Sequence, residues 1–190
     1  MEFEKSIYTA IFTLDMLGEE FTIETVESFL YLFGNSKAVL FKKDGHDKEF
    51  NNFLEWAGFN FDLRFSGPTD NSILSAIKEL TDLGLIRVTE CRGKYFPSIN
   101  KKNFYLDYFD PELFKLFYSF VSKFDIKINE IETLAKVAVL IIEKIDNIHF
   151  FDLKIDRREY KTLKRKVEKI LFNKTKEGGE YAVLRSSKSM

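Results

Sequence analysis

The sequence has little of what disulfide-bonded, zinc-binding or disordered proteins need. It contains one cysteine, two histidines and three prolines among 190 residues. The single cysteine, Cys91, excludes an internal disulfide framework and is typical of a reducing compartment. One cysteine and two dispersed histidines do not provide the ligand spacing of a zinc site. Because proline is scarce and low-complexity tracts are lacking, we expect an ordered chain as far as a loose tail over 174–190.

Long apolar runs are lacking as well. The longest one, Val137–Ile142, is far shorter than the roughly 20 residues that a helix needs to cross a bilayer. The first residues, Met1–Lys5, are charged and do not follow the pattern of a secretory signal peptide. We therefore expect a cytoplasmic protein without a membrane-spanning segment.

The residues that carry enzyme chemistry form no recognisable constellation. His46 lies in a polar loop, where a solvated imidazole is the common role, and His149 stands between two apolar residues, which is typical of a partly buried histidine. The glycine pair Gly178-Gly179 precedes no clear helix and so does not form a phosphate-binding loop. From this pattern we expect neither an enzyme nor a bound cofactor.

The most informative stretch is 69–99. Asp70 is a good N-cap, and Ile73, Ile77 and Leu80 recur at helical spacing before Gly84 ends the helix. Two segments, 85–90 and 94–99, have the composition of strands around a short turn at 91–93. Helix, strand, turn and strand form the second half of a winged helix-turn-helix. We predict an α+β, predominantly α fold: a winged helix-turn-helix with an inserted segment plus a C-terminal helical extension.

The remainder of the predicted winged domain, 1–103, contains two earlier helices and the insertion. Apolar spacing predicts helices over 4–17 and 23–33, ended by Gly18 and by Gly34-Asn35. Phe21-Thr22 is either a short strand or, through Thr22, the N-cap of the second helix. In the insertion at about 35–69, we expect a strand or turn over 37–41, a helix over 47–57 and an alternating strand over 59–65. Residues 66–68 are expected to break that strand.

The second region, 104–173, is predicted to be helical. Asp110 followed by Pro111 predicts the start of a helix that extends to 124, and further helices are expected over 128–145 and 156–172. Residues 154–190 hold 12 Lys and Arg against 5 Asp and Glu, whereas the rest holds 17 against 25. A basic end on an acidic body indicates either a phosphate-bearing partner or simply a solvated helix face. The basic stripe on the last helix comprises Arg158, Lys161, Arg165 and Lys169.

The segment from Phe59 to Val88 resembles the YwgA-like family of uncharacterised proteins. It has an alternating aromatic strand, then Gly67-Pro68, then a helix that ends in Gly84-Leu85-Ile86. The likeness extends over about 5–100 and departs from the family pattern at Ser66, where a tyrosine is usual. A weaker similarity links the segment to the Panacea domain of SocA-like antitoxins. The resemblance implies a winged-helix-like fold with an inserted strand, and its antitoxin side implies protein–protein interaction.

Two functions from different classes fit these observations. The first is a DNA-binding winged-helix regulator or adaptor that contacts duplex through its wing and its basic C-terminal helix, with a homodimer as a further expectation. The second is a non-enzymatic protein–protein interaction module of antitoxin or adaptor type. Acidic Glu79 and Asp82 on the third helix of the motif oppose the first function. Besides the basic stripe, the candidate DNA-binding residues are Asn71, Ser75, Lys78, Arg92, Lys94, Lys101 and Lys102.

Three aromatic residues near the basic pair Lys101-Lys102 leave a choice between two roles. Phe104, Tyr105 and Tyr108 stack on bases if they are exposed, or contribute to the core if they are buried. Core aromatics are the more common case, and we expect that role here.

Overall fold

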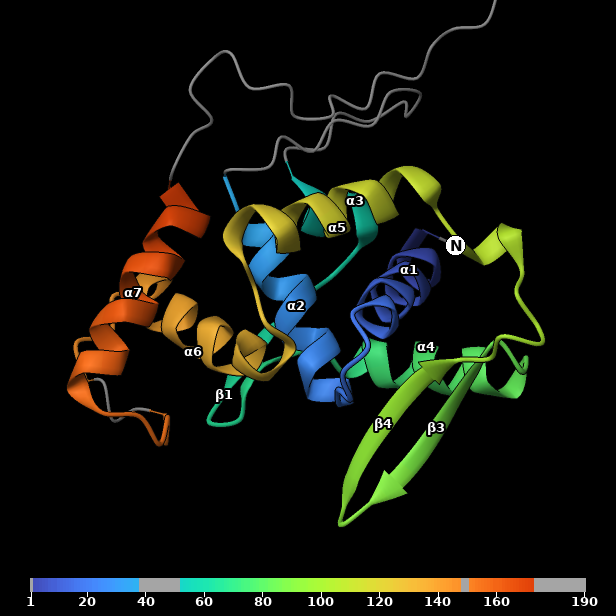
Figure 1. The fold of residues 1–190 in the computed structure, drawn as a ribbon, viewed down its shortest axis with the longest axis horizontal. Helices are drawn as coiled ribbons and strands as arrows, with labels where there is room; N and C mark the ends of the chain where they lie inside the picture. Colours follow the sequence, from blue (N-terminus) through green and yellow to red (C-terminus); the bar gives the residue numbers. More distant parts are fainter. Residues whose placement is uncertain (1, 38–51, 148–150, 173–190) are drawn as a thin grey trace, which may run out of the picture.

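The computed structural model describes residues 2–37, 52–147 and 151–172. Figure 1 shows α2 at the centre, with helices on several sides and the β3–β4 hairpin projecting away from them. This is an α+β, predominantly α architecture, as predicted. The helices are α1 Glu2–Met16, α2 Ile23–Asn35, α3 Phe53–Ala57, α4 Asn71–Asp82, α5 Pro111–Phe124, α6 Ile131–Ile142 and α7 Arg157–Phe172, with short 3-10 turns η1 Leu106–Tyr108 and η2 Ile128–Glu130. The strands are β1 Asp62–Arg64, β2 Gly67–Thr69, β3 Ile86–Cys91 and β4 Lys94–Ile99.

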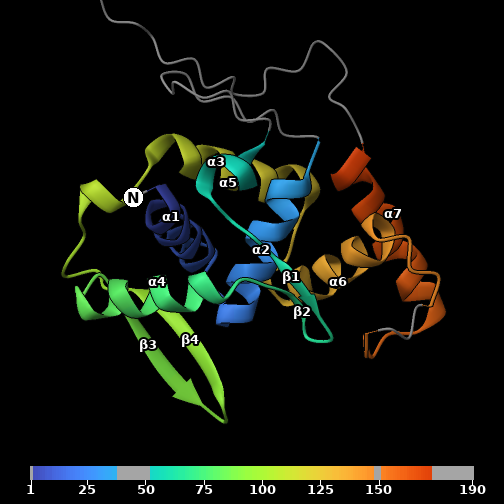
Figure 2. The ribbon, with the colours of Figure 1, turned by 180° about the vertical axis from the view of Figure 1, so that it is seen from behind.

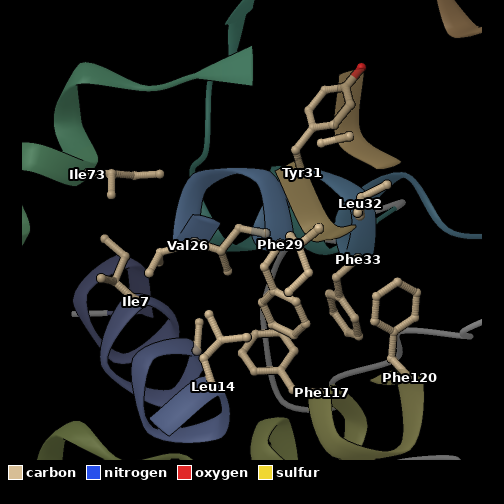
Figure 3. Packing of buried hydrophobic residues seen from close by; sticks show 14 of the residues in the cluster. Ile7, Leu14, Val26, Phe29, Tyr31, Leu32, Phe33, Ile73, Phe117 and Phe120 are labelled. Atoms are coloured by element: carbon tan, nitrogen blue, oxygen red, sulfur yellow. The ribbon is translucent and has the colours of Figure 1, made fainter. Parts of the chain in front are cut away.

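The central helix α2 is buried along most of its length and organises the core. The Phe29 ring lies 5.1 Å from the Phe117 ring of α5, and Phe33 lies 4.7 Å from the same ring (Figure 3). Side chains of α1 and α4 reach the same cluster, as do those of α6 and α7. The predicted N-terminal and C-terminal regions therefore share one hydrophobic core.

Thr22 is the N-cap of α2, and Phe21-Thr22 is not a strand. The Thr22 and Thr25 hydroxyls form a capping box with each other's backbone N–H groups. Both hydroxyls also donate to Oε1 of Glu132 on α6, at 3.1 and 2.8 Å. These contacts tie the start of α2 to α6. The helix continues through Gly34 and Asn35, where the sequence predicted its end. Gly34 serves packing instead, since an added Cβ there would lie 2.2 Å from the Leu54 side chain of α3.

The predicted helix and hairpin after Thr69 are confirmed. Asp70 is the N-cap of α4. At the C-terminal end of the helix, the N–H of Gly84 donates to the carbonyl of Thr81, and the N–H of Leu85 donates to the carbonyl of Leu80. Gly84 has a φ of +72°, the left-handed conformation that commonly ends a helix. β3 and β4 pair antiparallel, with Cys91 opposite Lys94. Cys91 is therefore the last residue of β3 and not part of the turn.

The alternating strand predicted over 59–65 is mostly wrong. Only β1 is a strand, and it forms a short hairpin with β2, which contains the Gly67-Pro68 pair expected to break the chain. Phe59 is buried but Phe65 is 77% exposed, so the alternation reflects a chain that leaves the core and turns back. In the helix predicted over 47–57, α3 is the confirmed part; residues 38–51 lie outside the described residues.

The C-terminal helices are close to their predicted positions. α5 begins after Asp110, whose carboxylate accepts from the N–H groups of Glu112 and Leu113. The helix predicted over 128–145 starts with the 3-10 turn η2 and ends at Ile142, and η1 was not predicted. The predicted tail over 174–190 lies outside the described residues. Among the helices of the described ranges, none combines the length and apolarity needed to span a bilayer.

Candidate nucleic-acid interface

Helix α4 presents a polar face to solvent. Ile73, Ile77 and Leu80 are buried in the core, as predicted, so the opposite face of the helix is fixed outward. Asn71, Ser75 and Lys78 are all exposed on the N-terminal two thirds of the helix. In helix-turn-helix proteins the N-terminal residues of the recognition helix contact base edges. The three predicted α4 residues are therefore accessible on the outer face of this helix.

Two buried carboxylates hold the N-terminus of α4. The Asp70 carboxylate accepts from the N–H of Ser72 at 2.9 Å and from the N–H of Asn60 at 2.8 Å. The N–H of Asp70 donates to Oε1 of Glu27 on α2 at 3.1 Å. Glu27 is only 5% exposed. The start of α4 is therefore positioned by hydrogen bonds to the preceding segment and to the central helix.

Burial raises the pKa of the Glu27 carboxyl from 4.5 to about 7. The hydrogen bond from Asp70 opposes this rise in pKa, and so does the more distant charge of Arg64. The negative charges of Glu24 and Asp70 add to it. Near neutral pH, Glu27 is thus divided between its protonated and ionised forms, directly beneath the helix cap.

The hairpin carries basic side chains at its tip. Arg92 and Gly93 form the two-residue turn with φ of 52° and 74°, the positive values that a type I′ turn needs. Arg92 and Lys94 are exposed there. Arg87 on β3, which no sequence pattern indicated, is exposed too, but it pairs with Ser98 near the base of the hairpin. The hairpin descends from the C-terminal end of α4, and its tip lies on the side of the helix N-terminus (Figures 1 and 2). We call Asn71, Ser75, Lys78, Arg92 and Lys94 the α4–hairpin surface.

Lys101 and Lys102 are exposed but belong to the other end of the hairpin. They follow β4 at its base, and a strand of this length spans roughly 20 Å. Nearby, the Asn100 amide donates to the carbonyl of Gly84 at 2.8 Å, which joins the hairpin base to the end of α4. The structure therefore separates this lysine pair from Arg92 and Lys94.

The basic stripe of α7 is exposed as predicted, but it lies far from the hairpin. Arg158, Lys161, Arg165 and Lys169 all face solvent, while the inner side of the helix packs on α6. Figures 1 and 2 both place α7 at one end of the molecule and the hairpin away from it. Lys166 lies on the same helix but outside the stripe. It forms an ion pair with Glu130 and donates a hydrogen bond to the Asp125 carbonyl at 2.7 Å. That lysine fixes α7 to the turn between α5 and α6.

The aromatic residues after the lysine pair are more exposed than expected. The Phe104 ring lies 5.6 Å from the Phe12 ring and 5.4 Å from the Phe109 ring, yet it remains partly open to solvent. Tyr105 is 53% exposed, whereas Tyr108 is half-buried. The core role predicted for these three is therefore wrong for Tyr105 and incomplete for Phe104.

Within the residues that the structure describes, no group of three or more His, Cys, Asp or Glu side chains is arranged to hold a metal ion. His46 and His149 both lie outside the described ranges. No protein-family model, curated protein or solved structure matches this chain. The resemblance to the YwgA-like family accordingly stays a prediction.

Proposed function

We propose that this protein is a winged-helix regulator that binds duplex DNA through the α4–hairpin surface. The observation that carries the proposal is the position of the basic hairpin tip on the side of the N-terminus of α4 (Figures 1 and 2). A recognition helix enters the major groove through its N-terminal residues. A hairpin on that side contacts the neighbouring phosphates with Arg92 and Lys94.

The charges along α4 support this orientation. Lys78 lies before Glu79 and Asp82, so the acidic side chains are confined to the C-terminal part of the helix. At the end where Asn71 and Ser75 are exposed, the neighbouring carboxylates of Asp70 and Glu27 are buried and hydrogen-bonded, so no acidic side chain of α4 itself is exposed to a phosphate there. Asparagine and serine also donate and accept hydrogen bonds at base edges. Of the acidic residues that opposed DNA binding in the sequence, Glu79 adjoins Lys78 at the edge of the proposed contact and Asp82 lies one turn beyond it.

The basic stripe of α7 is a second element of the predicted contact. Because it lies far from the hairpin tip, its contribution to binding can be tested apart from that of Arg92 and Lys94. A duplex on the α4–hairpin surface reaches α7 only by running along the length of the molecule (Figure 1). We infer that α7 contributes general electrostatic attraction and that the hairpin tip supplies close phosphate contacts.

The test is fluorescence anisotropy of a labelled duplex at about 50 and about 200 mM salt, because phosphate contacts release counterions. The key variant combines Arg92→Asn with Lys94→Gln. It removes both charges and leaves Asn-Gly, the pair that type I′ turns favour, so the hairpin is preserved. We expect weaker binding and a salt slope reduced by about 1 to 2.

Matched variants separate this contact from net charge. Lys115→Ala with Lys127→Ala removes two exposed positive charges on and after α5, which lies on the other side of the molecule from the hairpin tip (Figure 1). If that pair weakens binding as much as the tip pair, the proposed contact is wrong. Arg158→Gln with Lys161→Gln should lower affinity less than the tip pair does.

A protein-interaction module is the second candidate function. Leu74 on α4 is 51% exposed, and Leu83 at the end of the same helix is also open to solvent. Exposed leucines beside Glu79 and Asp82 suit a protein partner better than a polyanion. No salt-sensitive binding to any duplex at micromolar protein and low salt would favour this function. Loss of partner capture in a Leu74→Asp variant would then support it.

A further inference from the structure

The loop between β4 and α5 exposes apolar side chains beside a cavity. Leu106 is the most exposed of these at 74%, and Tyr105 and Phe104 precede it. Rings continue the surface from Phe104 through Phe109 and Phe114 to Tyr118, at centroid distances of 5.4, 5.7 and 6.0 Å. We call Phe104, Tyr105, Leu106 and Tyr118 the aromatic patch.

The cavity next to the patch has a volume of about 210 Å³. It lies where the end of α1 meets the base of β4, and Phe104 is shared between its wall and the patch. A cavity of about 150 Å³ already holds a benzene ring, so this one has room for a leucine side chain. Its lining residues are Phe12, Asp15, Met16, Ile99, Lys101 and Phe104.

We propose that the aromatic patch is a homodimer interface in which Leu106 of each copy enters the cavity of the other. The protruding side chain and the cavity belong to one surface, two residues apart in sequence at Leu106 and Phe104. If a two-fold axis relates two copies at this surface, Leu106 of each copy faces the cavity of the other. An isologous interface requires this kind of self-complementarity.

The charges around the patch favour a second copy over a charged partner. Lys101 and Lys102 contribute +2, and Asp15 and Asp107 contribute −2, so the rim is neutral in sum. A nucleic acid or an acidic peptide would meet two carboxylates on this rim. A second copy supplies both signs, and a two-fold arrangement lets opposite charges face each other twice.

The exposed area of the patch fits a weak dimer. A fully covered aromatic side chain removes 150–250 Å² from water, so the four side chains of the patch, each about half exposed or more, offer roughly 400 Å². Stable interfaces bury about 800 Å² per partner, about twice this area, so we expect a weak, concentration-dependent dimer. The patch lies away from the hairpin tip (Figure 1), so dimerisation leaves Arg92 and Lys94 uncovered, and the inference does not depend on the proposed DNA binding.

The first test is sedimentation velocity of the full chain from about 1 to about 200 µM. We expect a concentration-dependent dimer that Leu106→Asp weakens at least tenfold. Phe65→Asp is the matched control, since Phe65 is equally exposed but lies on the β1–β2 hairpin. A monomer at every concentration overturns the proposal, and so does a dimer that Leu106→Asp leaves intact or that Phe65→Asp disrupts equally.

Charge-reversal variants supply a second test that does not alter the apolar contact. Lys102→Asp changes the rim from neutral to −2, and Asp107→Lys changes it to +2. Each variant alone should dimerise at least tenfold more weakly, and an equimolar mixture of the two should regain association as a heterodimer. Recovery on mixing supports the interface. Two variants that both dimerise normally, or a mixture that stays monomeric, contradict it.

Discussion

Replacing Glu27 with glutamine should stabilise the protein at high pH and leave it nearly unchanged at low pH. The Glu27 carboxylate is buried on α2, where it accepts a hydrogen bond from the N–H of Asp70. Glutamine keeps a side-chain oxygen for that N–H and carries no charge. Glu27→Gln therefore imitates the protonated form of the native residue at every pH.

The size and sign of the effect follow from the pKa of Glu27. Its rise from 4.5 in the unfolded chain to about 7 in the fold corresponds to about 3 kcal/mol between the two protonation states. Below pH 4.5 the carboxyl is protonated in both states and costs nothing. As pH rises from 4.5 through 7, the unfolded chain loses the proton first, so the free energy of unfolding falls. Above pH 7 the full penalty of about 3 kcal/mol remains.

Urea unfolding of the wild type and of Glu27→Gln across pH 4 to 8 measures this penalty. The difference in unfolding free energy should be near zero at the acidic end and grow to roughly 2–3 kcal/mol at the basic end. Glu20→Gln is the matched control, because Glu20 is exposed two residues before the cap of the same helix. A difference that is constant with pH, or one that Glu20→Gln reproduces, would refute the reasoning.

Two further predictions concern packing and capping. Gly34→Ala should destabilise the protein by about 1–2 kcal/mol, because the new Cβ would lie 2.2 Å from the Leu54 side chain. In a double-mutant cycle, Leu54→Ala should relieve most of that cost. If the effects of the two substitutions on the unfolding free energy are additive, the clash is excluded. Asp70→Ala should lower the free energy of unfolding by about 2 kcal/mol at pH 5, where Glu27 is protonated. Asp70→Ser should lower it about half as much, because serine retains one acceptor for the Ser72 N–H but loses the hydrogen bond from Asn60. Equal losses for the two Asp70 variants in urea unfolding would show that the Asn60 contact contributes nothing.

Those parts of the fold that follow from local signals could be predicted from the sequence. α4 has an N-cap, a regular apolar stripe and a glycine stop, and each feature is decided within a few residues of the helix. The β3–β4 hairpin likewise follows from two strand-like segments and the Arg92-Gly93 turn. Such elements are specified by the chain on its own, so the structure adds detail without changing them.

The errors arise where distant contacts decide the structure. Phe59 to Phe65 alternates like one strand, but Phe59 joins the core while Phe65 sits in an exposed turn, because the chain reverses between β1 and β2. The location of the α7 stripe has the same origin. Its exposure follows from the inner stripe of the helix, whereas its distance from the hairpin depends on how α6 and α7 pack on α2.

Glu27 shows most clearly what a sequence pattern hides. It lies between Val26 and Ser28 on the buried part of α2, and its hydrogen-bond partner is 43 residues away at the cap of α4. Buried polar residues on α1 have simpler explanations: Thr13, for example, bonds the carbonyl of Thr9 in its own helix. A buried acid costs stability at neutral pH, and a residue that breaks a local rule without a local compensation points to a functional position. It lies beneath the N-terminus of α4, the end of the helix at which we propose DNA contact.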